Sequence, residues 1–221
     1  MSLKRLLFLT VLFSITSCAS IALAKTYDLP QIDSTISLSE KWFPINQEIV
    51  QRYNQDMLAR RPQSKTRYIA GFTLGMPSTG MNLGSNYIWI QATSNQGVSI
   101  TPEQLTSMLP KQAQAKKKEF ERDLKDRIKS FEPGSSHYQE RLGAIVYDTE
   151  ANIPNGSTVN LRSYLIVTKS AIISINAYTT PSSADTFFEQ VQGIVSTIDI
   201  KTSQKMSDSW LNSLRALMGK N

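Results

Sequence analysis

The chain has 221 residues, a formal net charge of +6 at pH 7, one cysteine and one histidine. These counts exclude an intrachain disulfide and a zinc site built from several cysteines or histidines. The length suffices for one domain with a hydrophobic core, and the mild positive charge selects no partner by itself.

Residues 1–24 show the pattern of a secretory signal peptide. Lys4 and Arg5 precede a short apolar run, and Ala22-Leu23-Ala24 offers a small-x-small cleavage site. The apolar run is shorter than a typical transmembrane helix, which needs about 20 apolar residues to span the bilayer. We therefore expect an exported, periplasmic protein that is cut after Ala24.

A second cut is an open alternative. Ile15-Thr16-Ser17-Cys18 resembles the lipobox of bacterial lipoproteins, in which the cysteine is lipidated and becomes the first residue. Cys18 is thus a candidate lipidation site, and the protein would then be anchored to a membrane by lipid. With either cut the mature domain carries no free thiol, which excludes a cysteine nucleophile.

The first half of the chain predicts a strand, a helix and a strand pair. Residues 34–42 read as the strand, and Pro44 suits the first turn of a helix that runs to about Arg60. Period-two alternation in "TRYIAGFTL" and "SNYIWIQAT" predicts two paired strands, with residues 75–84 as their loop.

A long helix is predicted next. Thr101 is the expected N-cap and Pro102 the first helical residue, while Pro110 should interrupt or restart the helix before it ends near Phe131. "EPGSSHYQE" (132–140) is expected to be a loop, and "RLGAIVYDTEA" (141–151) a strand.

The strands predicted over 161–168 and 171–178 are apolar on both faces, so we place them at the centre of a sheet that is covered on both sides. A helix with apolar residues from Ala184 to Ile198 should cover one of these faces. The fold class is therefore α+β, an antiparallel β-sheet flanked by helices on both faces, as a single domain over residues 25–202.

Residues 203–221 form a tail with one amphipathic helix. Its apolar stripe supplies the candidate partner-binding residues, which are Trp210, Leu211, Leu214, Leu217 and Met218. So short a helix is marginal alone in water and must bury this stripe. Its own domain, a partner protein and a peripheral membrane contact are the three alternatives.

Three stretches resemble the PsbP/Mog-like fold, in its branch of small exported bacterial proteins. They are "LRSYLIVTKSAIISINAYTT", "ADTFFEQVQGIVSTIDI" and "ISLSEKWFPI", and the resemblance spans Ile36 to Ile200. It implies a sandwich of sheet and helices and a non-enzymatic accessory, assembly or binding role, without a shared catalytic motif. Lys169-Ser170 stands where the family usually has a turn glycine.

Few residues offer catalytic chemistry. His137 is the only histidine that a catalytic triad could use, and it is expected in an exposed loop. Asp148 and Glu150 share a strand face and would be the carboxylates of a hydrolase. Lys169 and Ser170 are a candidate Ser/Lys pair, although a lysine in a turn should be solvated. In each case the structural interpretation is favoured.

The remaining motifs predict no ligand. The glycines between Gly71 and Gly84 lack a phosphate-binding spacing and read as a flexible hairpin connection. Lys116 to Lys118 interleave with acidic residues, which is typical of a solvated helix face. We expect no nucleic-acid partner, no cofactor and no metal.

The resulting hypothesis is an exported, non-catalytic accessory or binding protein of the cell envelope that acts through protein partners. One alternative is a small-ligand carrier with a cavity between sheet and helices, lined by Tyr68, Trp89 and Tyr178. Another is a hydrolase that uses carboxylates or a Ser/Lys pair. The specific partner, the ligand and the oligomeric state are left open by the sequence.

Overall fold

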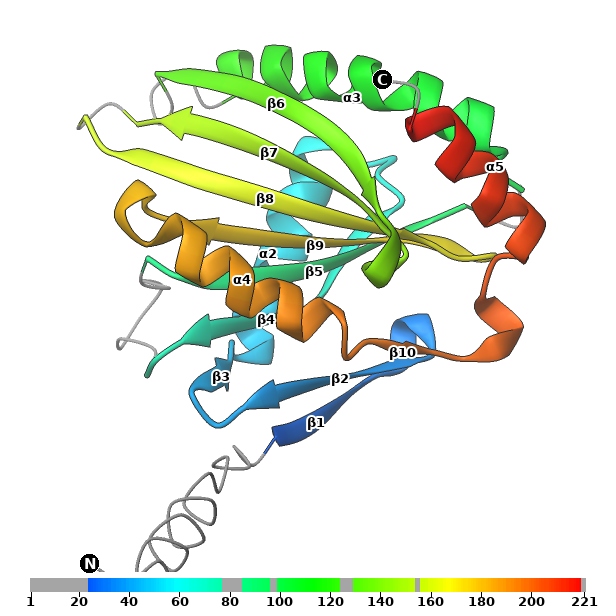
Figure 1. The fold of residues 1–221 in the computed structure, drawn as a ribbon. Helices are drawn as coiled ribbons and strands as arrows, with labels where there is room; N and C mark the ends of the chain where they lie inside the picture. The colour runs from blue at the N-terminus through cyan, green and yellow to red at the C-terminus, as the bar shows by residue number, and fades with distance from the viewer. Residues whose placement is uncertain (1–23, 77–84, 96–98, 124–128, 154–155, 220–221) are drawn as a thin grey trace, which may run out of the picture.

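The computed structural model describes residues 24–76, 85–95, 99–123, 129–153 and 156–219. It is an α+β arrangement in which helices lie on both faces of a large antiparallel sheet (Figure 1). The fold class predicted from the sequence is therefore confirmed. The predictions for residues 1–23, Cys18 included, for the loop residues 77–84 and for residues 124–128 lie outside the described residues.

The large sheet has seven strands in the order β3-β4-β5-β9-β8-β7-β6. They are β3 (Trp42–Pro44), β4 (Thr66–Leu74), β5 (Tyr87–Ser94), β6 (Ser130–Gln139), β7 (Ala144–Asn152), β8 (Thr158–Val167) and β9 (Ala171–Thr179). Every neighbouring pair is antiparallel. As predicted, β8 and β9 lie inside the sheet, because each has a partner on both sides.

A smaller sheet of three strands lies beside β3 (Figure 1). It consists of β1 (Ala24–Leu29), β2 (Ser34–Ser39) and β10 (Asp199–Ile200). The sequence predicted a strand at β2 but not at β1 or β10. The polar composition of β1 and the two-residue length of β10 leave too little alternation for either to be recognised.

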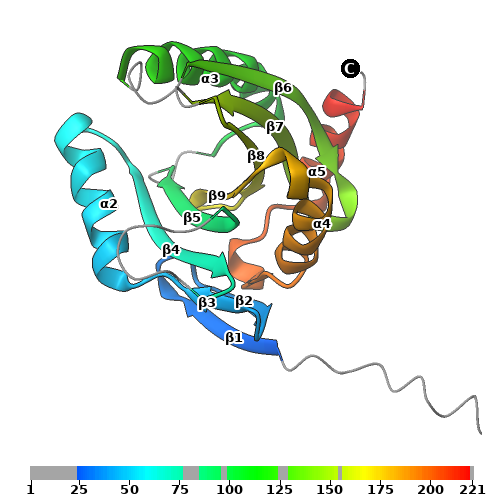
Figure 2. The same cartoon turned by 90° about the vertical axis from the view of Figure 1, so that its left-hand side faces the viewer.

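Helix α4 (Ala184–Val195) covers one face of the seven-stranded sheet, and α2 (Gln47–Arg60) and α3 (Pro102–Asp123) lie on the other (Figure 2). Helix α5 (Asp208–Met218) packs against α3 and β6. The described residues also contain four short 3-10 helices: η1 (Pro30–Ile32), η2 (Glu140–Leu142), η3 (Pro181–Ser183) and η4 (Thr202–Gln204).

The main hydrophobic core lies between α4 and the two sheets. We call this side of the large sheet the α4 face, and its buried residues include Ile88, Ile90, Ile173, Ile175, Phe187 and Val191. Ile173 and Ile175 are two apart on β9, so period-two alternation places both under α4. Burying this much apolar surface is the main source of stability that the fold shows.

Three local predictions need correction. Pro44 ends β3 rather than opening a helix, and Asn46 caps α2 by accepting a hydrogen bond from the Glu48 N–H at 2.9 Å. Helix α3 begins at Pro102 as predicted, with Thr101 and Gln104 exchanging capping hydrogen bonds. It continues through Pro110, since packing of Leu105 and Leu109 offsets the one hydrogen bond that the proline removes.

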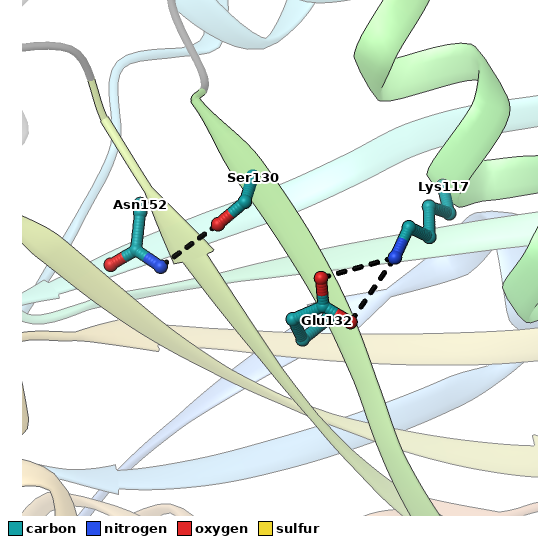
Figure 3. Close-up of polar contacts among 4 residues, drawn as sticks. All are labelled: Lys117, Ser130, Glu132 and Asn152. Atoms are coloured by element: carbon teal, nitrogen blue, oxygen red, sulfur yellow. Dashed lines mark hydrogen bonds and ion pairs between the residues drawn. The ribbon is translucent and has the colours of Figure 1, made fainter.

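The segment predicted as a loop, residues 132–140, is largely the edge strand β6. Pairing to β7 shifts register between Pro133 and Ser136, and this irregularity removes the alternation that marks a strand. Polar side-chain contacts add to the backbone pairing with β7 (Figure 3): Asn152 Nδ2 donates to Ser130 Oγ at 2.9 Å, and Lys117 of α3 donates to Glu132 at 3.0 Å. The ion pair helps to place α3 over β6.

Candidate binding site

The residues proposed for carboxylate or histidine catalysis are separated in the structure. His137 is exposed on β6, which corrects its predicted place in a loop. Asp148 forms a two-pronged ion pair with Arg162 at 2.6 and 2.9 Å, and this hydrogen bonding raises the pKa of Arg162. Glu150 is exposed on the same strand. The two carboxylates therefore share a strand without converging on a recess.

Lys169 and Ser170 lie in the turn between β8 and β9, which also contains Thr168. Both are exposed, and both bind Gln204: the Lys169 N–H donates to its carbonyl at 3.0 Å, and Ser170 Oγ donates to its side chain at 2.8 Å. The turn is thus an attachment point for η4. Nothing in these contacts orients the lysine amine toward the serine.

The glycine-rich segment is explained by packing where it is described. A side chain at Gly71 would meet Ile45 and the Trp89 ring, each at 2.6 Å. Only glycine leaves room for Trp89 to lie against β4, so Gly71 is a packing residue and not part of a phosphate loop. Among the described residues, no three or more His, Cys, Asp or Glu side chains gather in a metal-binding group.

The predicted amphipathic tail helix is present and docked. Leu214 and Met218 are buried in a cluster with Leu105, and the Trp210 indole donates to the Ile100 carbonyl at 2.7 Å. Leu211 and Leu217, on the two flanks of the stripe, are half-buried. Its own domain therefore covers the centre of the stripe. No helix in the described ranges has the length and apolar composition needed to cross a bilayer.

Aromatic residues gather on the side of the sheet that α2 and α3 flank. Here we define the tyrosine face, which consists of Tyr53, Tyr68, Tyr87, Trp89, Gln91, Tyr147 and Tyr178. Tyr53 of α2 lies with its ring centroid 5.5 Å from Tyr68 and 4.8 Å from Trp89. Tyr87 and Tyr178, a directly opposite pair on β5 and β9, are stacked at 4.8 Å. The chain has eight tyrosines, and five lie here.

A chain of hydrogen bonds runs across the strands beneath these rings. Ser163 Oγ donates to Asn176 Oδ1 at 2.7 Å, and Asn176 Nδ2 donates to Gln91 Oε1 at 3.1 Å. The Gln91 side chain in turn bonds the hydroxyl of Tyr68. Ser163 and Asn176 are buried, so these bonds supply partners that the two groups need. They also fix the orientation of the Gln91 amide.

Three phenols of the tyrosine face hold their protons more tightly than a free tyrosine does. Burial raises the pKa of Tyr68, of Tyr87 and of Tyr178. Neighbouring phenols add to this shift, since each disfavours the ionised form of the next. The surface consequently presents neutral hydroxyls, each able to donate and to accept a hydrogen bond.

Tyr68, Trp89 and Tyr178 were predicted to line one cavity, and they do lie on one face. Two hollows elsewhere have volumes of about 430 and 230 Å³, and they lie along β1, β3 and β4. None of the three aromatic residues lines either hollow. The sequence did not predict that Tyr53, Tyr87 and Tyr147 lie beside these three residues. They belong to α2, β5 and β7, and only the folded topology brings these elements together.

Comparison with solved structures identifies the architecture. Cyanobacterial PsbP (CyanoP) from Synechocystis sp. PCC 6803 superposes with a TM-score of 0.50 at 9% identity, covering 85% of this chain and 99% of its own. LpqN, described as involved in cell envelope biogenesis of Mycobacterium tuberculosis, gives a TM-score of 0.38 at 15% identity, covering 83% and 87%. The sequence matches no protein-family model and no curated protein.

The chain is therefore an α+β protein with a PsbP-like fold, as the sequence resemblance indicated. At 9% identity the likeness to cyanobacterial PsbP concerns the fold alone, and a fold does not determine an activity.

Proposed function

We propose that the protein is an exported, non-catalytic accessory protein of the cell envelope that acts by binding a partner protein. One observation carries this proposal: the candidate acids, bases and nucleophiles do not gather in one place, whereas the side chains that gather on the tyrosine face are neutral aromatic and amide groups. The residues with catalytic potential, Asp148, Ser170 and His137, lie on separate elements. Asp148 and Ser170 each have a structural hydrogen-bond partner.

Two further features support export and an accessory role. The first 24 residues have the organisation of a signal peptide, with lipid anchoring at Cys18 as the alternative to a free periplasmic protein. The fold is shared with cyanobacterial PsbP. Intact mass of the protein purified from cells separates the two forms, because lipidation at Cys18 adds acyl chains and leaves seven more residues than a cut after Ala24.

We place the partner contact along α5, where it lies against α3. Leu214 and Met218 are taken up by the domain itself, whereas Leu211 and Leu217 keep part of their surface accessible. Met108 of α3 is an exposed large apolar residue, at 40% of its full surface. Apolar side chains that remain accessible along a docked helix suit a second protein better than water.

Site-specific photocrosslinking in cells tests this contact. A photoreactive residue at Ala216, exposed on α5, should give a discrete adduct in the envelope fraction, and the matched position Gln190, exposed on α4, should give none. Expression without residues 2–24 is the control for export and should abolish the adduct. Equal adducts at both positions, or none at any exposed α5 position, would reject a partner bound through α5.

A further inference from the structure

The positive charge of the protein is concentrated at one end of the large sheet. We call this region the basic end and define it by three segments: residues 60–67, which run from the end of α2 into β4, residues 169–170 in the turn between β8 and β9, and residues 201–205, which include η4. The three segments contain seven lysines and arginines and no acidic residue. The rest of residues 25–221 carries 15 cations and 18 anions, so the basic end accounts for the positive net charge.

Hydrogen bonds join the three segments into one stripe across the strand ends. The Ser94 N–H at the end of β5 donates to the Lys65 carbonyl at 3.3 Å, and the Asn95 side-chain amide donates to the Lys169 carbonyl at 2.8 Å. Lys169 in turn donates its N–H to the Gln204 carbonyl at 3.0 Å. Because neighbouring strands lie about 4.8 Å apart, the main chains of Lys65 and Lys169, on either side of β5, are held about 10 Å from each other.

All cations of the basic end are exposed: Arg60, Arg61, Lys65, Arg67, Lys169, Lys201 and Lys205. Lys201 forms an ion pair with Asp33, which lies outside the three segments. Like charges gathered on one surface repel one another, and water and salt screen this repulsion only in part. An acidic partner would replace the repulsion by attraction, so the stripe favours a ligand with several negative charges.

The basic end continues into the partner contact proposed above, since two residues separate Lys205 from α5. The register of the small sheet places β10, and Lys201 after it, at the opposite end from Ala24. Figure 1 likewise shows α5 and the segment before it away from the start of β1. A lipid at Cys18 would hold a membrane near Ala24, so the basic end would face away from it. This placement favours a protein over that membrane as the partner.

We propose that the basic end binds an acidic segment of the partner protein that contacts α5. This inference rests on the proposed partner contact and adds its chemistry: several aspartate or glutamate side chains in an extended stretch across the ends of β4, β5 and β9. From Lys65 to Gln204 the stripe is about 15 Å long, which about five extended residues span. Carboxylates pair with lysine and arginine, and such pairs steer association and fix its register.

Charge reversal tests the proposal in the crosslinking experiment described above. Lys65→Glu/Lys169→Glu should reduce the adduct formed from Ala216 at least about fivefold, because two attractive charges become repulsive. Lys65→Arg/Lys169→Arg keeps both charges and should leave the adduct at its native level. Lys25→Glu/Lys41→Glu is the matched control, since it makes the same change in net charge at two exposed lysines near the other end of the small sheet. It should also leave the adduct unchanged.

A fluorescent peptide of ten glutamates is the probe for the purified mature chain. It should bind Lys65→Glu/Lys169→Glu at least about tenfold more weakly than the native chain, and the Lys25→Glu/Lys41→Glu control within about threefold of it. Native binding should weaken as the Debye length falls from about 30 Å at 0.01 M salt to about 8 Å at 0.15 M. Vesicles of phosphatidylglycerol, used in sedimentation, are the comparison with an anionic lipid surface.

Three outcomes would overturn the proposal. One is an Ala216 adduct that Lys65→Glu/Lys169→Glu leaves at its native level, which would show that the α5 contact does not use the basic end. Another is equal weakening of peptide binding by the two charge-reversed double variants, which would make net charge rather than position the cause. The third is binding to the vesicles through Lys65 and Lys169 without binding to the peptide, which would make the partner a lipid surface.

The two proposals fail in different ways. An adduct at Ala216 that is absent even from the native chain would reject the α5 contact, and the peptide titration would then decide on the basic end by itself.

Discussion

The two faces of the central sheet differ although the same strands make both. On β9, Ile173, Ile175 and Ala177 point to the α4 face and have no accessible surface. The alternating positions Ser174, Asn176 and Tyr178 face the tyrosine side, where hydroxyls and amides replace aliphatic groups. One strand thus supplies aliphatic residues to the core under α4 with Ile173, Ile175 and Ala177, and polar and aromatic residues to the tyrosine face with Ser174, Asn176 and Tyr178.

The difference lies in how the two faces contribute to stability. Aliphatic side chains under α4 have no function other than to fill space, so any loss of volume there should cost folding free energy. On the tyrosine face the rings pack, but their hydroxyls are not needed to fill a core. Substitutions on the two faces should therefore differ in what they damage.

The largest expected effect is on the α4 face. Phe187→Ala should lower the free energy of unfolding by about 3–5 kcal/mol, because it leaves a cavity between α4 and the sheet. Phe187 is 2% exposed and contacts Trp42 with ring centroids 5.8 Å apart. Urea denaturation followed by circular dichroism measures the change.

Glu189→Ala, at an exposed position of the same helix, is the control and should stay within about 0.5 kcal/mol of the native chain. If Phe187→Ala cost no more than this control, α4 would not cover the core in the way described.

The hydrogen-bonded row gives the next largest effect. Asn176→Ala should lower the free energy of unfolding by about 1–3 kcal/mol, because Ser163 loses its acceptor and Gln91 its donor while Ser163 stays buried. Ser174→Ala, two residues earlier on the same face, is the control and should cost less. Equal costs for the two variants would show that the row does not act as a connected unit.

Sequence patterns predicted the elements that alternate cleanly and missed those held by other forces. The strands β8 and β9 and the cap at Thr101 follow from period-two alternation and from helix-capping chemistry, both of which are local. Strand β6 was missed because a register shift interrupts its alternation and because its side-chain contacts, such as Lys117–Glu132, are polar. Local patterning contains no signal for a strand of that kind.

The candidate site was predicted only in part for the same reason. Tyr68, Trp89 and Tyr178 stood out because each lies in a recognisable strand. Tyr53 lies on a helix and Tyr147 on a strand that joins the sheet on the far side of β8, so their convergence depends on strand order. A single sequence does not specify that order.

Alkaline pH should weaken the fold through both faces. Burial raises the pKa of Tyr87 on the tyrosine face and raises the pKa of Tyr164 on the α4 face to about 12. Above pH 10 the unfolded chain releases these protons first, so it binds fewer protons than the folded chain, and stability falls as pH rises. Each such tyrosine contributes about 1.4 kcal/mol per pH unit until its folded pKa is reached.

Denaturation midpoints between pH 9 and pH 11.5 test this dependence. Tyr87→Phe should lose stability less steeply than the native chain, because it removes one of the phenols whose pKa burial raises. A native curve that is flat across this range would mean that the phenols of the tyrosine face ionise as freely in the folded state as in water.

The smallest expected effect is the one that separates the two faces most sharply. Tyr178→Phe should change the free energy of unfolding at neutral pH by less than about 1 kcal/mol, because phenylalanine keeps the ring that stacks on Tyr87 and removes only a neutral hydroxyl. Ser163→Ala is the comparison, since it removes a hydroxyl that is fully buried and bonded to Asn176. If Tyr178→Phe proved the costlier of the two, the hydroxyl of Tyr178 would contribute more to the stability of the fold than the buried hydrogen bond of Ser163 does.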